Sequence, residues 1–228
     1  MTTESDEQPI EIYQLRFWFV GVQPIVWRRL LIRSDQTLAD LHYAIQICCS
    51  WSDYYLHQFK IHGKTYGVPR LHGVCYTQSA QSVRLSDLRL RLNERFPYEY
   101  NFFVNWLLEI RLEKRCIYEQ GRNYPICIGG KGAAPPEDCG GPLHFNELRS
   151  HYSPFFIWAQ LVEYYEMYQR LDELTQDEKY ELEDRESGLR RLAYWINIDK
   201  FKRRPVNQLL KKYATNDESW WEVEEVSW

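Results

Sequence analysis

The sequence predicts an α+β protein, in which a mixed or antiparallel sheet packs against helices and the C-terminal region is helical. Residues 10–20 and 106–118 alternate apolar and polar side chains, which is typical of strands with one face in a core. Residues 38–49 and 155–168 instead repeat apolar residues every three or four positions, which is typical of helices. The chain has 228 residues, 44% of them hydrophobic, which is enough for a substantial core.

Three further segments are expected to complete the sheet. Pro24 ends the first strand, and a second extended run follows over residues 26–32. Residues 59–66 alternate around the turn candidate His62-Gly63, which predicts a hairpin. Residues 98–104 are expected to form the strand that precedes 106–118.

The helices are predicted from capping and periodicity. Thr37 and Asp40 have the spacing of a capping box, so the helix over 38–49 should begin there. A second helix is expected over 155–168 and a third over 177–195, which is acidic first and basic later. Two packed helices are the simplest arrangement of this pair.

The chain divides most simply into one domain with flanking segments. Residues 1–9 are expected to be a flexible N-terminus, and residues 10–213 one α+β domain whose helical part starts at about 152. Residues 214–228 form an acidic, Trp-rich tail. Within the domain, residues 124–142 hold four prolines and five glycines, which favours a structured loop.

Composition excludes some classes of protein. A net charge of −4 argues against a chain that coats nucleic acid by charge alone. No apolar run approaches the roughly 18 residues of a membrane span, and the polar N-terminus lacks the features of a signal peptide. The six cysteines lack the close spacing of a zinc knuckle, although a metal pair of Cys127 and Cys139 is a weaker alternative. We therefore expect a cytoplasmic protein with reduced thiols and no cofactor.

Several ordered motifs resemble those of one family. They are Trp27-Arg28-Arg29, Leu56-His57-Gln58-Phe59, the run Pro135-Pro136-Glu137-Asp138-Cys139-Gly140-Gly141, and Val206-Asn207-Gln208-Leu209-Leu210. Together they resemble the plasmid pRiA4b ORF-3-like family, which is often found on plasmids and mobile elements. The resemblance implies an α+β fold and such a genetic setting, but no activity.

The central strand pair departs from that family. The family typically has Tyr-Asp-Phe-Gly-Asp-x-Trp-x-His, whose two acids and imidazole could bind a metal or transfer protons. Residues 100–108 here read Tyr-Asn-Phe-Phe-Val-Asn-Trp-Leu-Leu, so both acids and the histidine are replaced. The resemblance therefore implies a degenerate site, in which Phe103 and Leu108 either complete the core or line an apolar groove.

A relocated enzyme site is one alternative that stays open. His57, Glu137, Asp138 and Cys139 could form it if their two motifs meet, with Cys139 as nucleophile or all four as metal ligands. The structural interpretation is a stiff turn whose acids bind backbone groups. Either Arg28 or Arg29 is expected to point inward and pair with Glu137 or Asp138.

The sequence favours a non-catalytic binding or regulatory protein that acts through protein contact. The expected contact surfaces are the aromatic helix around Phe155, Trp158 and Tyr165 and the tail with Trp220 and Trp221. One alternative is a metal- or thiol-dependent enzyme at the relocated site. Another is a nucleic-acid binder that uses the basic segment 200–212. The basic residues proposed for that contact are Lys202, Arg203 and Arg204.

Overall fold

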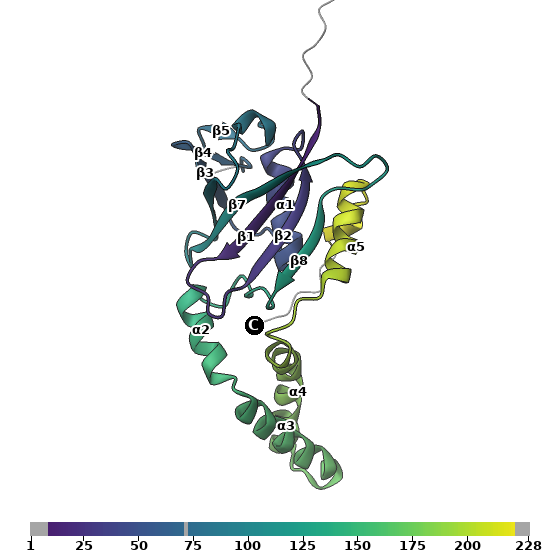
Figure 1. The fold of residues 1–228 in the computed structure, drawn as a ribbon. Helices are drawn as coiled ribbons and strands as arrows, with labels where there is room; N and C mark the ends of the chain where they lie inside the picture. The colour runs from purple at the N-terminus through teal and green to yellow at the C-terminus, as the bar shows by residue number, and fades with distance from the viewer. Residues whose placement is uncertain (1–8, 71–72, 222–228) are drawn as a thin grey trace, which may run out of the picture.

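A computed structural model describes residues 9–70 and 73–221, which form a sheet, helices on one of its faces and a helical arm (Figure 1). The strands are β1 (Glu11–Phe19), β2 (Trp27–Arg33), β3 (His57–Ile61), β4 (Lys64–Gly67), β5 (Gln78–Ser79), β6 (Arg95–Tyr100), β7 (Trp106–Ile117) and β8 (Ile126–Lys131). The α-helices are α1 (Leu38–Cys49), α2 (Gly141–His151), α3 (Pro154–Gln169), α4 (Gln176–Ile196) and α5 (Arg203–Ala214). Short 3-10 helices are η1 (Ser86–Leu88), η2 (Leu171–Glu173) and η3 (Glu218–Trp221).

The strands form one eight-stranded mixed sheet in the order β5-β4-β3-β6-β7-β1-β2-β8. Neighbouring strands are antiparallel except β4 and β5, which are parallel. The predicted α+β class is therefore confirmed. The predicted hairpin also forms, because His62 and Gly63 take the positive φ angles, 50° and 75°, of its turn.

Helix α1 lies behind the central strands in Figure 1 and encloses the main core. Its first turn has the expected capping box, in which the Thr37 hydroxyl accepts from the Asp40 amide and the Asp40 carboxylate accepts from the Thr37 amide. Side chains of the inward face, such as Leu15, Phe17 and Ile110, are fully buried. Ten of the twelve α1 residues are buried as well, so this helix is packed on nearly all sides.

Two predictions about strand boundaries are wrong. The strand expected over 98–104 ends at Tyr100, because Asn101 and Asn105 adopt left-handed backbone angles and make a turn. The region 124–142, expected to be a loop throughout, begins with β8. Its glycines allow this edge strand to run close to Trp27 and Phe201.

Helix α5 covers the outer edge of β8. The Asn207 side chain accepts from the amide of Cys127 at 2.8 Å and donates to the carbonyl of the same residue at 2.9 Å. The Arg203 guanidinium donates to the carbonyl of Ile128 at 2.9 Å. These side-chain groups satisfy part of the backbone that an edge strand leaves unpaired.

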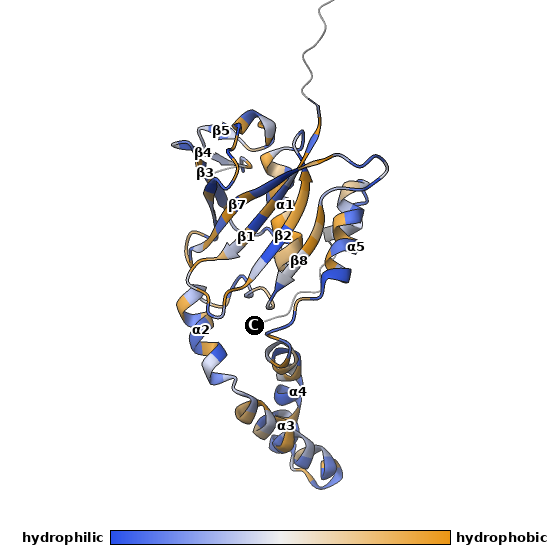
Figure 2. Cartoon of the chain, in the orientation of Figure 1, coloured by the Kyte–Doolittle hydropathy of each residue, from blue (hydrophilic) through white to orange (hydrophobic). Residues whose placement is uncertain are grey.

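Helices α2, α3 and α4 form an arm that extends away from the sheet (Figure 1). Phe145, Ile157 and Trp195 join the base of the arm to the main core. Farther out, Met167, Leu174 and Leu182 form a small separate cluster. Apolar and polar residues both occur along α3 and α4 (Figure 2), and large apolar side chains of α3, such as Phe155 and Trp158, are exposed.

The tail returns to the domain beyond α5. Trp220 is only 8% exposed and packs against Tyr43 and Tyr213, with ring centroids 5.6 and 5.1 Å away. Trp220 is therefore a core residue of this chain, contrary to the predicted contact role. The side chain of Trp221 lies outside the described part of the structure. None of the helices described is long and apolar enough to cross a membrane.

Candidate functional site

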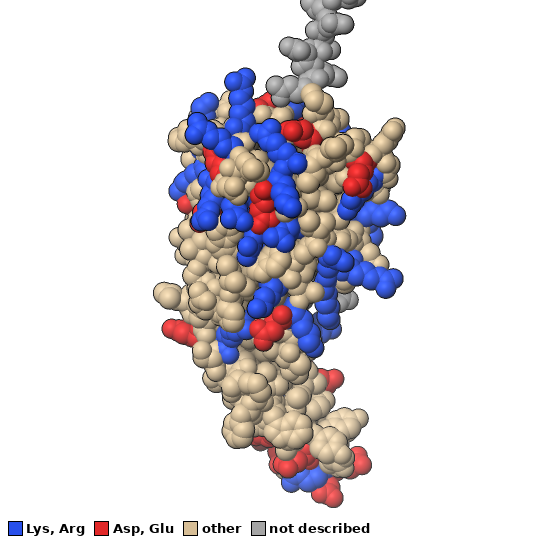
Figure 3. Space-filling model, in the orientation of Figure 1, with Lys and Arg blue, Asp and Glu red and all other residues tan. Residues whose placement is uncertain are grey.

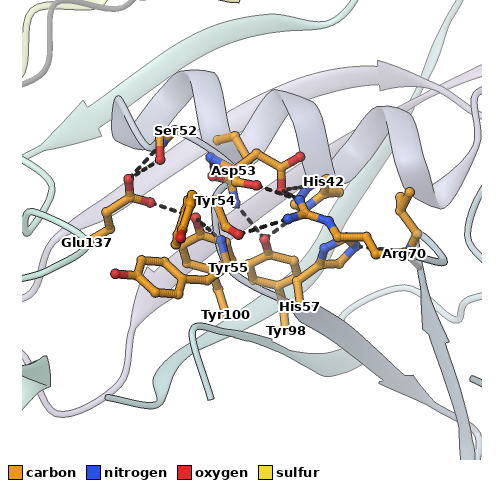
Figure 4. A network of polar contacts seen from close by, with 12 residues as sticks. His42, Ser52, Asp53, Tyr54, Tyr55, His57, Arg70, Tyr98, Tyr100 and Glu137 are labelled. Carbon is orange, nitrogen blue, oxygen red and sulfur yellow. Dashed lines mark hydrogen bonds and ion pairs between the residues drawn. The ribbon is translucent and has the colours of Figure 1, made fainter. Parts of the chain in front are cut away.

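A buried polar network lies where α1, the segment after it, β3 and β6 meet (Figure 4). Its centre is His42 of α1, which is 0% exposed although it stands among apolar helix residues. Asp53 has a left-handed backbone conformation, with a φ angle of 56°, and its carboxylate points back to His42 of the helix. His57 at the start of β3 and Tyr98 of β6 complete the centre.

Three of these residues, His42, Asp53 and Tyr98, close a ring of hydrogen bonds together with Gln46 of α1. The Asp53 carboxylate lies 2.9 Å from His42 Nε2, which therefore carries the proton and donates. His42 Nδ1 then accepts from the Tyr98 hydroxyl at 2.8 Å. Gln46 donates to the same hydroxyl at 2.9 Å and accepts from the Asp53 amide at 3.2 Å. Each residue in the ring therefore restricts the orientation of the two residues to which it is hydrogen-bonded.

His57 stacks on His42, with ring centroids 3.5 Å apart and ring planes 11° apart. Burial lowers the pKa of His42 well below 6.5, and the nearby Arg70 lowers it further. Burial also lowers the pKa of His57, and the neighbouring His42 adds to this shift. Both imidazoles are therefore neutral at neutral pH.

Arg70 closes the network from the loop after β4. Its guanidinium lies 2.7 Å from the Asp53 carboxylate and donates to the backbone carbonyls of Asp53 and Tyr54. Burial raises the pKa of Asp53, and Arg70 opposes this rise. The Arg70 guanidinium therefore places a positive charge against the Asp53 carboxylate of the network.

A metal ion is the obvious ligand to consider, because donor atoms of His42, Asp53 and His57 lie within 4.8 Å of one another. The stacked imidazoles, however, direct their in-plane lone pairs side by side rather than towards a common point. His42 and Asp53 are also engaged in the ring, and Arg70 would repel a second cation. The donors therefore fit a hydrogen-bonded core better than a metal site.

A second polar network connects the loop after β8 to Ser52, which is the neighbour of Asp53 in the first network, and to Tyr100. One Glu137 carboxylate oxygen accepts from the amide and hydroxyl of Ser52, and the other accepts from the Tyr100 hydroxyl at 2.6 Å. The Glu137 backbone carbonyl accepts from Trp106 Nε1 at 2.9 Å. The Asp138 carboxylate accepts from the Tyr55 hydroxyl. The predicted interpretation had the acids binding backbone groups. Glu137 does accept from one backbone amide, that of Ser52, but the other donors to the two acids are side-chain hydroxyls.

This geometry gives little support to an enzyme site formed by His57, Glu137, Asp138 and Cys139. Glu137 and Asp138 lie beside Ser52 and Tyr55, whereas His57 is engaged with His42. Burial raises the pKa of Cys139 to about 12, so its thiol is protonated at neutral pH and is a poor nucleophile. The structure thus gives the candidate residues separate, structural partners.

Arg28 points inward as expected, but it does not pair with Glu137 or Asp138. It is 1% exposed and donates to the carbonyls of Trp27, Cys48 and Lys131 at 2.9 to 3.2 Å. Its guanidinium also lies 3.9 Å from the centre of the Phe201 ring. The predicted ion pair fails because backbone carbonyls and an aromatic face take the place of a carboxylate.

The two ends of the altered family segment have different surroundings. Leu108 is 0% exposed and completes the core, whereas Phe103 is 96% exposed. Between them, the Val104 carbonyl lies so close to Gly141 that a Cβ there would approach it to 2.5 Å. Leu108 is therefore a core residue and Phe103 a surface residue, and the two do not share a groove.

The remaining predicted contact residues are mostly exposed. Lys202 and Arg204 are exposed at the start of α5, and Arg203 is held by β8 as described above. Trp158 is 66% exposed on the arm. Trp27 and Arg29 are partly exposed on the sheet face opposite α1, where Arg29 pairs with Glu113 at 2.6 Å.

The sequence model of a protein family, described as plasmid pRiA4b ORF-3-like protein, matches residues 11–187 of this chain. The chain belongs to this family. The chain is also similar to an uncharacterized protein, y4hQ, of Sinorhizobium fredii (strain NBRC 101917 / NGR234), with 28% identity over 138 residues, which is 60% of this chain and 71% of that protein.

A solved relative supports the family fold. The crystal structure of a protein of unknown function, MM3350, from Methanosarcina mazei Go1 is 34% identical to this chain, with a TM-score of 0.55. The match covers 64% of this chain and 82% of the other. Both relatives are described as uncharacterized or of unknown function. The solved structure supports the fold of this pRiA4b ORF-3-like protein, and neither relative indicates an activity.

His42, Asp53 and Arg70 were not among the site residues predicted from the sequence. A signal for His42 was present, because His42 and Gln46 are polar residues four positions apart within the apolar helix 38–49. Two polar side chains on a helix that is otherwise apolar indicate a buried partner. Arg70 carried no comparable signal, since it lies in an irregular loop.

Proposed function

We propose that this pRiA4b ORF-3-like protein is a cytoplasmic, non-catalytic binding protein, encoded on or near a mobile element, that contacts a protein partner through its α3–α4 arm. The observation that carries the proposal is a stripe of exposed aromatic side chains along α3. Phe155 is 81% exposed, Trp158 66%, Tyr165 59% and Tyr168 57%. Large aromatic residues that a monomer leaves exposed in one stripe are typical of contact surfaces.

The aromatic residues of the stripe are different from the residues that pack α3 against α4 and the domain. Ile157 and Met167, on the other side of α3, are buried against the domain and α4. Arg185 of α4 forms two hydrogen bonds of 2.9 Å with Glu163 of α3. The buried contacts and the ion pair thus hold the arm together, while the aromatic side chains of the stripe remain exposed to another molecule.

The charge of the arm indicates what kind of partner surface would bind it. Residues 154–186 contain ten acidic and three basic residues. Figure 3 shows acidic side chains at the tip of the arm, beyond a broad uncharged surface. An aromatic stripe on an acidic helix pair is complementary to an apolar groove with a basic rim. We therefore propose a protein partner with a basic surface.

The test compares two variants that remove apolar surface at different places. The arm variant carries Phe155→Ser, Trp158→Ser and Tyr165→Ser, and the control carries Tyr54→Ser and Ile117→Ser, which replace residues outside the arm that are 77% and 90% exposed. Each tagged protein is purified from its native host with nuclease present, and the recovered protein is then reconstituted with purified components. We expect one stoichiometric basic partner that binds the control and loses at least tenfold in affinity for the arm variant.

Two results would overturn the proposal. One is a partner that the arm variant binds as tightly as the unmodified protein. The other is self-association, seen as a dimer by light scattering that the arm variant abolishes, because the stripe would then be covered by a second copy.

A further inference from the structure

Four arginines form a row across four adjacent strands. Arg95 of β6 lies opposite Arg111 of β7, Arg111 lies opposite Arg16 of β1, and Arg16 lies opposite Arg29 of β2. We call these residues the arginine row. Their sequence neighbours on each strand, such as Phe96, point into the core, so the row lies on the opposite face. With a strand spacing of about 4.8 Å, it spans roughly 14 Å.

Such a row of like charges destabilises the sheet unless anionic groups neutralise it. Like charges directly opposite each other destabilise a pair of strands. The row has two carboxylates: Glu113 binds Arg29 and Arg111 at 2.6 and 3.0 Å, and Glu109 lies 3.5 Å from Arg95. Within the described residues, no carboxylate is within ion-pair distance of Arg16. The row therefore keeps an excess of positive charge.

Polar groups of the row are also unsatisfied. The Nε atoms of Arg16 and Arg111 are both buried and have no hydrogen-bond partner among the described residues. Buried N–H groups of this kind are rare and call for a specific explanation, such as a bound anion. These two arginines lie opposite each other at the centre of the row.

An aromatic pair lies directly beside the arginines. Trp18 of β1 and Trp27 of β2 face each other across the two strands, and both are partly exposed. The guanidinium of Arg16 lies 4.8 Å from the centre of the Trp27 ring, and that of Arg95 lies 5.3 Å from the centre of the Trp18 ring. Flat cationic and aromatic groups thus lie together on the face of the sheet.

This face is open in the described structure. Helix α1 lies behind the strands in Figure 1, and Figure 3 shows Lys and Arg side chains gathered over the strands on the side turned towards the viewer. Single-stranded nucleic acids bind proteins through phosphate contacts to Arg and Lys and through stacking of bases on aromatic rings and guanidinium planes. Both kinds of group occur here on adjacent strands.

We propose that the outer face of the sheet binds single-stranded nucleic acid, with phosphates along the arginine row and bases stacked on Trp18 and Trp27. This proposal is independent of the arm and differs in place from the basic segment 200–212. An acidic polypeptide would also suit the arginines, but its carboxylate side chains carry no flat ring to stack on the tryptophans, whereas every nucleotide carries both a phosphate and a base.

The experiment measures fluorescence anisotropy with a labelled single-stranded oligonucleotide of about 15 nucleotides. Its duplex form and a labelled poly-glutamate peptide are measured in parallel, at about 50 and 200 mM salt. The row variant carries Arg16→Gln and Arg111→Gln, and the stacking variant is Trp18→Leu. The control variant carries Lys202→Gln and Arg204→Gln, which removes the same charge from α5. Thermal unfolding confirms that each variant is folded.

We expect the single strand to bind more tightly than the duplex or the peptide. The row variant should bind at least tenfold more weakly, and its log affinity should fall less steeply with log salt, by about 1.4 for two phosphate contacts. The stacking variant should bind about fivefold or more weakly with an unchanged salt slope, and the control variant should bind as the unmodified protein does.

Other results would overturn the proposal. They include no binding at the lower salt, equal binding of duplex and single strand, and an effect of the control variant as large as that of the row variant. Tight peptide binding that Trp18→Leu leaves unchanged would instead identify an acidic polypeptide as the occupant.

Discussion

His42 and His57 lie face to face in the core, with ring centroids 3.5 Å apart, and neither ring is measurably open to solvent. Protonation of either ring would bury a charge away from solvent, and protonation of both would place like charges in contact, so the stacked pair favours two neutral imidazoles. The pair therefore links the stability of the fold to pH.

The first prediction is that the protein loses stability in mild acid. Both histidines have a pKa below 6.5 in the folded state, so the unfolded chain binds protons that the folded chain does not. Their contribution is fully present above about pH 6.5 and is lost as pH falls below it, by at most about 1.4 kcal/mol per pH unit for each histidine. His57→Phe should remove about half of this slope, measured by urea unfolding between about pH 7.5 and 5.5. An exposed control, His144→Gln, should keep it, and an unchanged slope in His57→Phe would contradict the assignment.

The second prediction concerns the ring of hydrogen bonds. Tyr98→Phe removes the hydroxyl that donates to His42 and accepts from Gln46, so two buried groups lose a partner. We expect the free energy of unfolding to fall by about 1–3 kcal/mol. The matched control is Tyr168→Phe on the exposed arm, which should change it by less than about 0.5 kcal/mol. Equal values for the two variants would show that water replaces the hydroxyl.

The third prediction separates the two apolar ends of the altered family segment. Leu108→Ala should cost about 2–5 kcal/mol of unfolding free energy, because it opens a cavity in the core. Phe103→Ala, at a 96% exposed residue, should cost less than about 0.5 kcal/mol. Urea unfolding of both proteins measures this difference. A large cost at Phe103 would mean that its ring is covered.

The fourth prediction concerns the six thiols. Cys75 is exposed and Cys116 partly exposed, whereas Cys48, Cys49, Cys127 and Cys139 are buried. Two thiols per chain should react with Ellman's reagent in the native protein, and six should react in denaturant. Cys139→Ser should leave the native count unchanged. Rapid native labelling of Cys139 would revive the thiol-enzyme alternative.

Much of the fold follows from local sequence patterns. The alternation in β1 and β7, the capping box at Thr37 and the hairpin turn at His62-Gly63 were predictable because each depends on near neighbours in the chain. Strand β8 was not, since its glycine-rich composition is also that of a loop and its pairing with β2 is distant in sequence.

The polar side chains at the candidate site and in the arginine row were less predictable than the fold. In the row, Arg16 and Arg111 come into register only after a β-bulge at Gln14 and Leu15, and such a shift leaves no clear trace in the sequence. Arg28 was expected to need a carboxylate, yet backbone carbonyls from three separate segments surround it. These groups are present in every sequence, so a list of side chains cannot reveal them.

The contact between Asn207 and Cys127 also bears on aggregation. At the opposite edge of the sheet β5 is only two residues long, and short edge strands recruit other chains poorly. At β8, one side-chain amide occupies the backbone groups to which a strand of another molecule would bind. A protein shortened before α5 would expose this edge, and we expect it to form intermolecular sheets while the rest of its core is intact. The C-terminal helix thus protects the protein from its own copies.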